Sequence, residues 1–202
     1  MTLRFAVTFD YLCPFARNAH EHVLAGLAAG ADWEVDFVPF SLAQGHVEPG
    51  EPDVWEGAAA GTAPGVLALQ VGLAARDTAP EGFLELHRRL FAARHDDGRD
   101  LKDRDVLGEV VRDAGLDPTE LFAVVDEGTP LEALRTEHNW AVAEHEVWGV
   151  PIFIAGGRAV FIRVLDRPQG DAALARRRIE RLVELITDEP MLHEFKQTDL
   201  PM

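Results

Sequence analysis

A cysteine and a proline stand side by side where a strand is followed by a helix, near the start of the chain. Residues 3–9 (LRFAVTF) are rich in β-branched and aromatic residues, a composition typical of a strand. Apolar residues then recur at helical spacing over residues 16–28. Pro14 suits the first position of that helix, where a missing N–H costs no hydrogen bond. The sequence therefore predicts an α/β fold with Cys13 at the N-terminal tip of a helix.

Cys13 is the only cysteine in the 202 residues, and its position favours reactivity. Unpaired backbone N–H groups and the positive end of the helix dipole meet at a helix N-terminus. Both favour the thiolate, which is the nucleophilic form of cysteine, and Arg17 one turn later adds positive charge. We therefore expect an exposed Cys13 with a lowered pKa that acts as the catalytic nucleophile. The alternative is an inert cysteine that packs in the core as a small apolar side chain.

The composition excludes several classes of partner. The formal net charge of −16 argues against nucleic acid, which requires clustered lysine and arginine, and against an anionic membrane surface. No apolar run approaches the roughly 18 residues that a membrane-spanning helix needs. The first residues lead into a strand rather than a secretory signal, and a single cysteine excludes intrachain disulfides. We expect a cytoplasmic protein without nucleic-acid or membrane partners; the sequence leaves a homodimer open.

The rest of the chain contains two further strand regions and many helical patterns. Residues 33–40 alternate apolar and charged side chains, which predicts a second strand. Two apolar runs flank Gly156-Gly157, a pair typical of two-residue hairpin turns, and Pro151 opens the first run. Residues 41–53 are predicted to form a loop. Helical patterns lie near residues 54–60, 64–76, 80–95, 103–114, 117–127, 130–146 and 172–187.

This order of strands and helices resembles the thioredoxin fold in its DsbA-like branch. Cys13-Pro14-Phe15 matches the start of that family's Cys-Pro-x-Cys motif, and Val150-Pro151 matches the pair at its cis-proline. The branch includes cytoplasmic dithiol oxidoreductases, kappa-class glutathione transferases and hydroxychromene-carboxylate isomerases. Two motifs in the expected order and structural context indicate the fold more strongly than either does alone.

The resemblance implies a thioredoxin-like domain that is interrupted by helices. Residues 39–42 match the segment that follows the family's second strand. Residues 1–53 and 147–202 would then form the thioredoxin-like domain, in the order β-α-β and β-β-α. Residues 54–146 would form an inserted helical domain between these two halves.

The resemblance also implies where a small thiol would bind. In the family the peptide bond before this proline is cis, and the backbone of Val150 would then lie beside the sulfur of Cys13. An extended thiol compound would pair with that backbone as a short added strand. Tyr11 would hydrogen-bond the ligand or pack in the core, and Phe15 would line the pocket or pack in the core. The expected thiol-binding residues are Tyr11, Pro14, Phe15, Val150 and Pro151.

One departure from the family motif bears on function. The family's second cysteine, which resolves the mixed disulfide formed by the first, falls at Ala16. We therefore expect a monothiol thiol–disulfide oxidoreductase, in which Cys13 attacks a disulfide substrate and a low-molecular-weight thiol resolves the adduct. Glutathione or mycothiol would be this co-substrate, and no tightly bound cofactor is expected.

Two other functions fit the same residues. The kappa-class and isomerase enzymes also lack the second cysteine and commonly carry serine in the first position. Cys13 would then bind a small thiol non-covalently, for a transferase or isomerase reaction on an electrophilic substrate. The other alternative is a non-catalytic thioredoxin-like module that binds a partner through its helical insertion. No metal site is expected, because His20 and His22 do not share a helical face.

Overall fold

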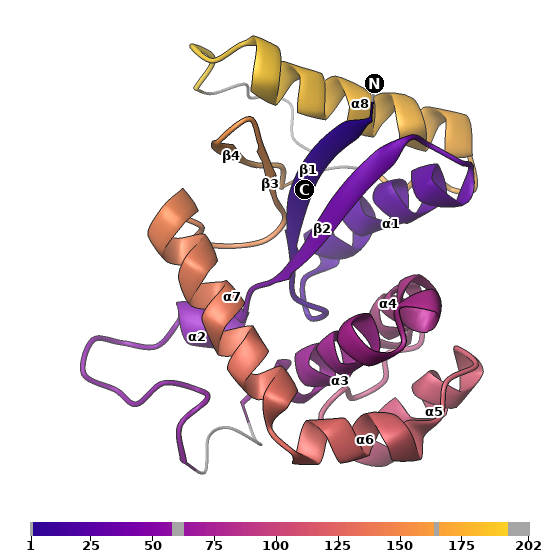
Figure 1. Ribbon diagram of the computed structural model, residues 1–202, viewed down its shortest axis with the longest axis vertical. Helices are drawn as coiled ribbons and strands as arrows, with labels where there is room; N and C mark the ends of the chain where they lie inside the picture. The colour runs from indigo at the N-terminus through magenta and orange to yellow at the C-terminus, as the bar shows by residue number, and fades with distance from the viewer. Residues whose placement is uncertain (1, 58–62, 164–165, 194–202) are drawn as a thin grey trace.

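A mixed β-sheet forms the centre of the computed structural model, which describes residues 2–57, 63–163 and 166–193 (Figure 1). Within these residues the strand order is β2-β1-β3-β4. The two central strands are β1 (Leu3–Phe9) and β3 (Ile152–Ala155), which pair antiparallel. On the outer sides, β2 (Trp33–Pro39) runs parallel to β1, and β4 (Arg158–Phe161) runs antiparallel to β3.

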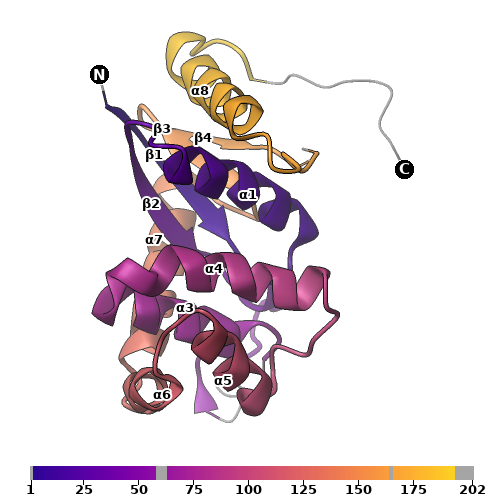
Figure 2. The ribbon, with the colours of Figure 1, turned by 90° about the vertical axis from the view of Figure 1, so that its right-hand side faces the viewer.

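Helices pack around the sheet in two groups (Figure 2). In the first group, α1 (Pro14–Ala28) and α8 (Ala172–Asp188) pack against each other, and α8 also contacts β3 and β4. The second group lies between β2 and β3 in the chain. It consists of α2 (Leu42–Gly45), α3 (Val66–Thr78), α4 (Pro80–His95), α5 (Arg104–Asp113), α6 (Pro118–Asp126) and α7 (Thr129–His145). The predicted α/β fold with helices inserted between the two halves is confirmed.

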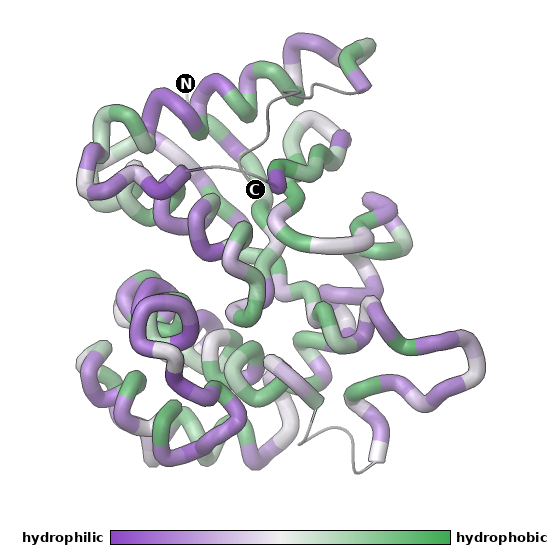
Figure 3. Tube along the Cα trace, turned by 180° about the vertical axis from the view of Figure 1, so that it is seen from behind, coloured by the Kyte–Doolittle hydropathy of each residue, from purple (hydrophilic) through white to green (hydrophobic). Residues whose placement is uncertain are grey.

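The inserted helices contact the sheet and α1 directly. Helix α3 packs against α4, α6 and α7, while α4 contacts α1 and α7 contacts β2. One continuous apolar cluster includes residues of the strands, such as Phe9 and Phe37, together with residues of the insertion, such as Leu73 and Phe91. The outer helices are amphipathic: hydrophobic and hydrophilic residues alternate around the turns of α8 in Figure 3. The insertion therefore shares the core of the sheet.

The predicted hairpin is confirmed, and its turn explains the two glycines. Gly156 and Gly157 connect β3 to β4 with φ values of 56° and 75°. Two consecutive positive φ angles belong to the turn whose twist matches that of paired strands, and glycine adopts them without a steric cost. The register then pairs Ala155 with Arg158 and Phe153 with Val160.

The segment after β2 differs in part from the prediction. Residues 41–53 contain the short helix α2, which Ser41 begins by accepting a hydrogen bond from the N–H of Gln44 at 3.2 Å. A serine N-cap is a local signal for a helix start that the loop prediction passed over. The helix predicted near residues 54–60 is wrong over its described part, because residues 54–56 form a turn and a bend and no α-helix includes residues 54–57; residues 58–60 lie outside the described residues.

Candidate active site

Cys13 is the N-cap residue of α1, as the sequence predicts. Its backbone is extended, with φ −89° and ψ 116°, and Pro14 occupies the first turn. The N–H of Ala16 donates a hydrogen bond to the Cys13 sulfur at 3.4 Å, so the thiol caps the helix as a serine hydroxyl would. The N–H of Cys13 donates to the carbonyl of Asp10 at 3.0 Å, which closes the turn between β1 and α1.

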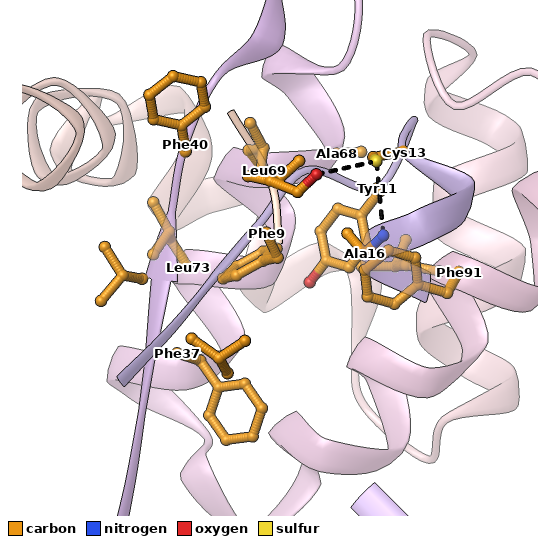
Figure 4. Packing of buried hydrophobic residues seen from close by; sticks show 14 of the residues in the cluster. Phe9, Tyr11, Cys13, Ala16, Phe37, Phe40, Ala68, Leu69, Leu73 and Phe91 are labelled. Carbon is orange, nitrogen blue, oxygen red and sulfur yellow. Dashed lines mark hydrogen bonds between the residues drawn. The ribbon is translucent and has the colours of Figure 1, made fainter. Parts of the chain in front are cut away.

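The backbone of Val150 lies against the sulfur from the far end of the chain. The Val150–Pro151 peptide bond is cis. The Cys13 S–H donates to the carbonyl oxygen of Val150 at 3.4 Å, across 137 positions of sequence. Figure 4 shows the sulfur between this oxygen and the N–H of Ala16. The structure therefore brings the two sequence motifs, Cys13-Pro14 and Val150-Pro151, into direct contact.

Thr8 of β1 holds the loop around Pro151 in place. Its buried hydroxyl donates to the carbonyl of Gly149 at 3.4 Å and accepts from the N–H of Ile152 at 2.9 Å. Sequence analysis missed this role, because threonine is an ordinary strand residue. The available signal was a polar side chain inside the apolar run of β1.

Aromatic residues and one arginine lie at the surface around these motifs. Phe15 is 37% exposed beside Cys13, and the guanidinium of Arg163 lies 5.6 Å from the centre of its ring. The N–H of Ile162 donates to the carbonyl of Pro151 at 3.1 Å, which ties the end of β4 to the cis-proline loop. Trp148, two residues before Val150, is 67% exposed. Phe15 thus has the surface position that a pocket wall requires.

A protein-family model identifies the family of this chain. The model of the DSBA-like thioredoxin domain matches residues 6–167. The chain belongs to the DSBA-like thioredoxin domain family. Among its relatives, the uncharacterized protein YwbO of Bacillus subtilis is 24% identical over 189 residues, covering 79% of this chain and 90% of YwbO. The uncharacterized protein Rv2286c of Mycobacterium tuberculosis is 30% identical over 174 residues, covering 82% of this chain and 70% of Rv2286c.

Solved structures of DsbA-type proteins share the fold. DsbA from Pseudomonas aeruginosa aligns with a TM-score of 0.60 and 16% identity, over 94% of this chain and 84% of that one. Oxidised BdbD from Bacillus subtilis aligns with a TM-score of 0.61 and 14% identity, over 90% of this chain and 87% of that one. Against this DsbA-like background the chain carries one cysteine, and Ala16 occupies the position expected for the second.

The structure corrects the prediction of an exposed, thiolate-forming Cys13. The residue is only 7% exposed, and burial raises the pKa of its thiol. The N–H groups of Ala16 and Phe15 lower this pKa, and the nearby carboxylate of Asp10 raises it. Arg17, expected to assist, instead pairs with Glu21 at 3.3 Å and with Asp96. The helix N-terminus is present as predicted, but burial has the larger effect on the thiol.

Asp10 is a fully buried carboxyl group three residues before Cys13. One carboxyl oxygen accepts from the N–H of Leu12 and the other from the N–H of Leu42, both at 2.9 Å. Burial raises the pKa of Asp10 to about 6, although both hydrogen bonds act to lower it. Asp10 therefore joins the Cys13 turn to the start of α2 and places a titratable group near the thiol.

Tyr11 packs in the core, which is one of the two alternatives for this residue. Its side chain is fully buried and points into the interior beside Phe91 (Figure 4). The hydroxyl hydrogen-bonds Nδ1 of His87 at 2.9 Å, so the expectation that it contacts a ligand is corrected. Gly72 of α3 permits this position, because a Cβ atom there would lie 2.4 Å from the Tyr11 oxygen.

Three of the buried histidines, His20, His87 and His138, pack among aromatic side chains of the core. His87 Nε2 hydrogen-bonds His20 Nδ1 at 2.8 Å, and His20 Nε2 hydrogen-bonds the carbonyl of Thr8 at 3.2 Å. Burial lowers the pKa of His20 to about 4 and that of His87 well below its ordinary value. His138, between the rings of Phe40 and Trp55, also has its pKa lowered to about 4 by burial.

Across residues 2–57, 63–163 and 166–193, no group of three or more histidine, cysteine, aspartate or glutamate side chains is arranged to hold a metal ion. None of the helices in these ranges is long and apolar enough to span a membrane.

Proposed function

We propose that this chain is a monothiol thiol–disulfide oxidoreductase that uses Cys13 and an external low-molecular-weight thiol, glutathione or mycothiol. The observation that carries the proposal is the contact between the Cys13 sulfur and the Val150 carbonyl. The proposal is supported by this contact, because an extended thiol compound that pairs with the backbone at Val150 would bring its sulfur close to that of Cys13. Membership of a DsbA-like family supports thiol chemistry, and the absence of a second cysteine supports the external thiol.

The proposed reaction has two exchange steps. In the first, Cys13 loses its proton and the thiolate attacks one sulfur of the substrate disulfide. A bond forms between Cys13 and that sulfur, and the other half of the substrate leaves as a thiolate that takes up a proton. In the second step, the thiolate of the co-substrate attacks the substrate sulfur held by Cys13, forms a disulfide with it and releases Cys13 as the thiolate. When the substrate is a mixed disulfide whose Cys13-bound half is the same small thiol, the other half leaves as a reduced thiol and two molecules of the small thiol end as their disulfide.

The raised pKa of Cys13 determines how this reaction depends on pH. Attack requires the thiolate, whereas burial and the S–H donation to Val150 favour the protonated thiol. The first step therefore accelerates as the pH rises toward the pKa of Cys13.

A second candidate is favoured by the protonation state of the same thiol. A thiol that stays protonated at neutral pH can donate a hydrogen bond to the sulfur of a bound thiolate, as the family's serine is expected to do. In a transferase or isomerase of this kind Cys13 forms no covalent bond with the small thiol. The S–H donation to Val150 shows that the thiol acts as a donor in the free protein.

The two candidates are separated by replacing the sulfur. Cys13→Ser keeps a donor at the same place but removes the nucleophile, and Cys13→Ala removes both. Reduction of a mixed disulfide between glutathione and a cysteine peptide is measured beside conjugation of glutathione to an aryl halide. Loss of disulfide reduction in both variants supports the oxidoreductase. Conjugation that survives in Cys13→Ser but not in Cys13→Ala supports the transferase.

The native protein provides an independent measurement. Intact mass spectrometry after incubation with oxidised glutathione or oxidised mycothiol detects a mixed disulfide at Cys13 directly, and addition of the free thiol should reverse it. A Cys13 that forms no adduct and a chain without activity in either assay would leave the non-catalytic binding module as the remaining function.

A further inference from the structure

A continuous chain of buried hydrogen bonds runs through four fully buried residues. The Tyr11 hydroxyl contacts His87 Nδ1 at 2.9 Å, and His87 Nε2 contacts His20 Nδ1 at 2.8 Å. His20 Nε2 contacts the carbonyl oxygen of Thr8 at 3.2 Å. These residues come from the turn after β1, from α4, from α1 and from β1, so the chain crosses between the insertion and the sheet.

The direction of every hydrogen bond follows from the last acceptor. A backbone carbonyl only accepts, so Nε2 of His20 carries the proton toward Thr8. Each ring is neutral because burial lowers its pKa, and a neutral ring has one donor and one acceptor nitrogen. His20 Nδ1 therefore accepts from His87 Nε2, and His87 Nδ1 accepts from the Tyr11 hydroxyl. This network fixes the tautomers of His20 and His87. Each of their four ring nitrogens has a hydrogen-bond partner.

The two ends of this hydrogen-bond network lie beside the two segments of the candidate active site, which are the loop at Val150–Pro151 and the turn that carries Cys13. Thr8 binds Gly149 and Ile152 through its hydroxyl, on either side of the Val150–Pro151 bond. Tyr11 lies two residues before Cys13. The same helix, α4, also supplies His95, whose Nε2 donates to the Tyr11 carbonyl at 2.9 Å.

We propose that Thr8 and His87 are positioning residues that together fix the Cys13 sulfur against the Val150 carbonyl. Thr8 holds the loop that carries the carbonyl, and His87 holds the turn that carries the sulfur. His20 hydrogen-bonds both His87 and the Thr8 carbonyl, so the turn and the loop are held by one network. Helix α4 of the insertion takes part in it through His87. This inference rests on the proposed function only in taking Cys13 as the reacting group.

The consequence for the thiol has a definite sign. The Val150 carbonyl accepts the S–H proton and thereby stabilises the protonated thiol. A looser loop or turn weakens that hydrogen bond and exposes the sulfur, and both changes favour the thiolate. Loss of a hydrogen bond of ordinary strength corresponds to about a two- to tenfold change in thiolate fraction below the pKa.

The test follows the rate of Cys13 alkylation by iodoacetamide across pH, with the full chain and no disulfide substrate. Thr8→Val removes the hydroxyl at nearly constant volume, and Thr8→Ser retains it. We expect the Val variant to have a lower Cys13 pKa and about two- to tenfold faster alkylation near neutral pH, and the Ser variant to match the wild type. Tyr11→Phe, which removes the donor to His87, should shift the pKa in the same direction.

A control separates positioning from general destabilisation. Leu121→Ala truncates a buried side chain of α6, a helix that packs against α3, α5 and α7. It should lower the free energy of unfolding without changing the Cys13 profile. An unchanged profile in a folded Thr8→Val variant would overturn the proposal, and an unchanged profile in Tyr11→Phe would overturn the part assigned to His87. If Thr8→Val does not fold, Thr8→Ala with Thr8→Ser as its reference gives the same comparison. Because no disulfide is reduced in this assay, its outcome is independent of whether the oxidoreductase activity is found.

Discussion

The sulfur of Cys13 lies 3.4 Å from the carbonyl oxygen of Val150 and donates its proton to that oxygen. The contact joins a helix N-terminus to the loop that precedes β3, and it ties the protonation state of the thiol to the position of that loop. The N–H of Ala16 approaches the same sulfur from the other side at 3.4 Å and favours the thiolate. The reactivity of Cys13 depends on the balance between these two contacts, because donation to Val150 stabilises the thiol and the Ala16 N–H stabilises the thiolate.

The first prediction concerns the pH dependence of activity. Because burial raises the pKa of Cys13, we expect disulfide reduction to increase with pH beyond the ordinary cysteine pKa of about 8.5. The logarithm of the rate should rise with a slope near one and level off above the pKa of the thiol. Stopped-flow measurement of the first exchange step at low substrate checks this. A rate that is already level below neutral pH would contradict it and would indicate a stabilised thiolate.

The second prediction concerns stability in acid. The unfolded chain takes up a proton on His20 as the pH falls below 6.5, whereas in the folded chain that histidine stays neutral down to about pH 4. Acid therefore favours unfolding in this window, by on the order of 3 kcal/mol for His20 alone. His87 and His138 act in the same direction. Urea unfolding at a series of pH values measures the decrease, and a free energy of unfolding that does not change below pH 6.5 would contradict it.

The third prediction isolates the opposing effect of Asp10. Its pKa is about 6 in the folded chain and 3.8 in the ordinary carboxyl group, so the folded state binds a proton that the unfolded state lacks between these values. Asp10 thus stabilises the fold as the pH falls, against the histidines. In Asp10→Asn this contribution is absent, and the loss of unfolding free energy between pH 6 and 4 should be steeper than in the wild type. Equal slopes in the two proteins would show that Asp10 titrates normally.

Local rules in the sequence were sufficient for several parts of this site. Proline in the first helical turn predicted that Cys13 is an N-cap, and Gly156-Gly157 predicted the hairpin turn, because each rule concerns neighbouring residues. The meeting of Cys13 with Val150 came from family resemblance rather than from the residues themselves. No spacing within the chain encodes a contact across 137 positions.

The burial of the thiol and the histidine chain could not be derived in the same way. Helix-dipole reasoning treated Cys13 as exposed, whereas its exposure depends on how the loop at Val150 packs over it. His20 and His87 come together only because α4 packs against α1. A histidine on a helix carries no local sign that it will contact another histidine 67 positions away. The spacing of His20 and His22 argued only against a metal motif.

The fourth prediction compares two glycines within helices. A Cβ atom at Gly72 would lie 2.4 Å from the Tyr11 oxygen, so Gly72→Ala must displace the hydroxyl that contacts His87. Overpacking of this kind costs about 1–3 kcal/mol of unfolding free energy. At Gly108 the nearest atom to a new Cβ is a Phe122 carbon at 3.5 Å, so Gly108→Ala should stabilise the chain by about 0.5–1 kcal/mol through helix propensity. Chemical denaturation measures both, and a stabilising Gly72→Ala would contradict the close approach.

The fifth prediction concerns which small thiol is the co-substrate. Arg163 makes no ion pair with any residue that the structure describes, and its guanidinium lies 5.6 Å from the ring of Phe15. The Ile162 N–H that binds the Pro151 carbonyl places this arginine next to the cis-proline loop. Glutathione carries two carboxylates that such a guanidinium can bind, whereas mycothiol is a sugar-linked cysteine without them.

Arg163→Gln should therefore raise the KM for glutathione by about three- to tenfold and leave kcat unchanged, because the contact is made equally in the ground state and the transition state. The KM for mycothiol should not change. Arg177→Gln, which removes the same charge from the exposed side of α8, is the matched control and should leave both values unaltered. An equal rise in KM for both arginine variants would mean that net charge steers the anionic thiol toward the protein. A rise for neither variant would show that Arg163 does not contact the co-substrate, and mycothiol would then be the better candidate.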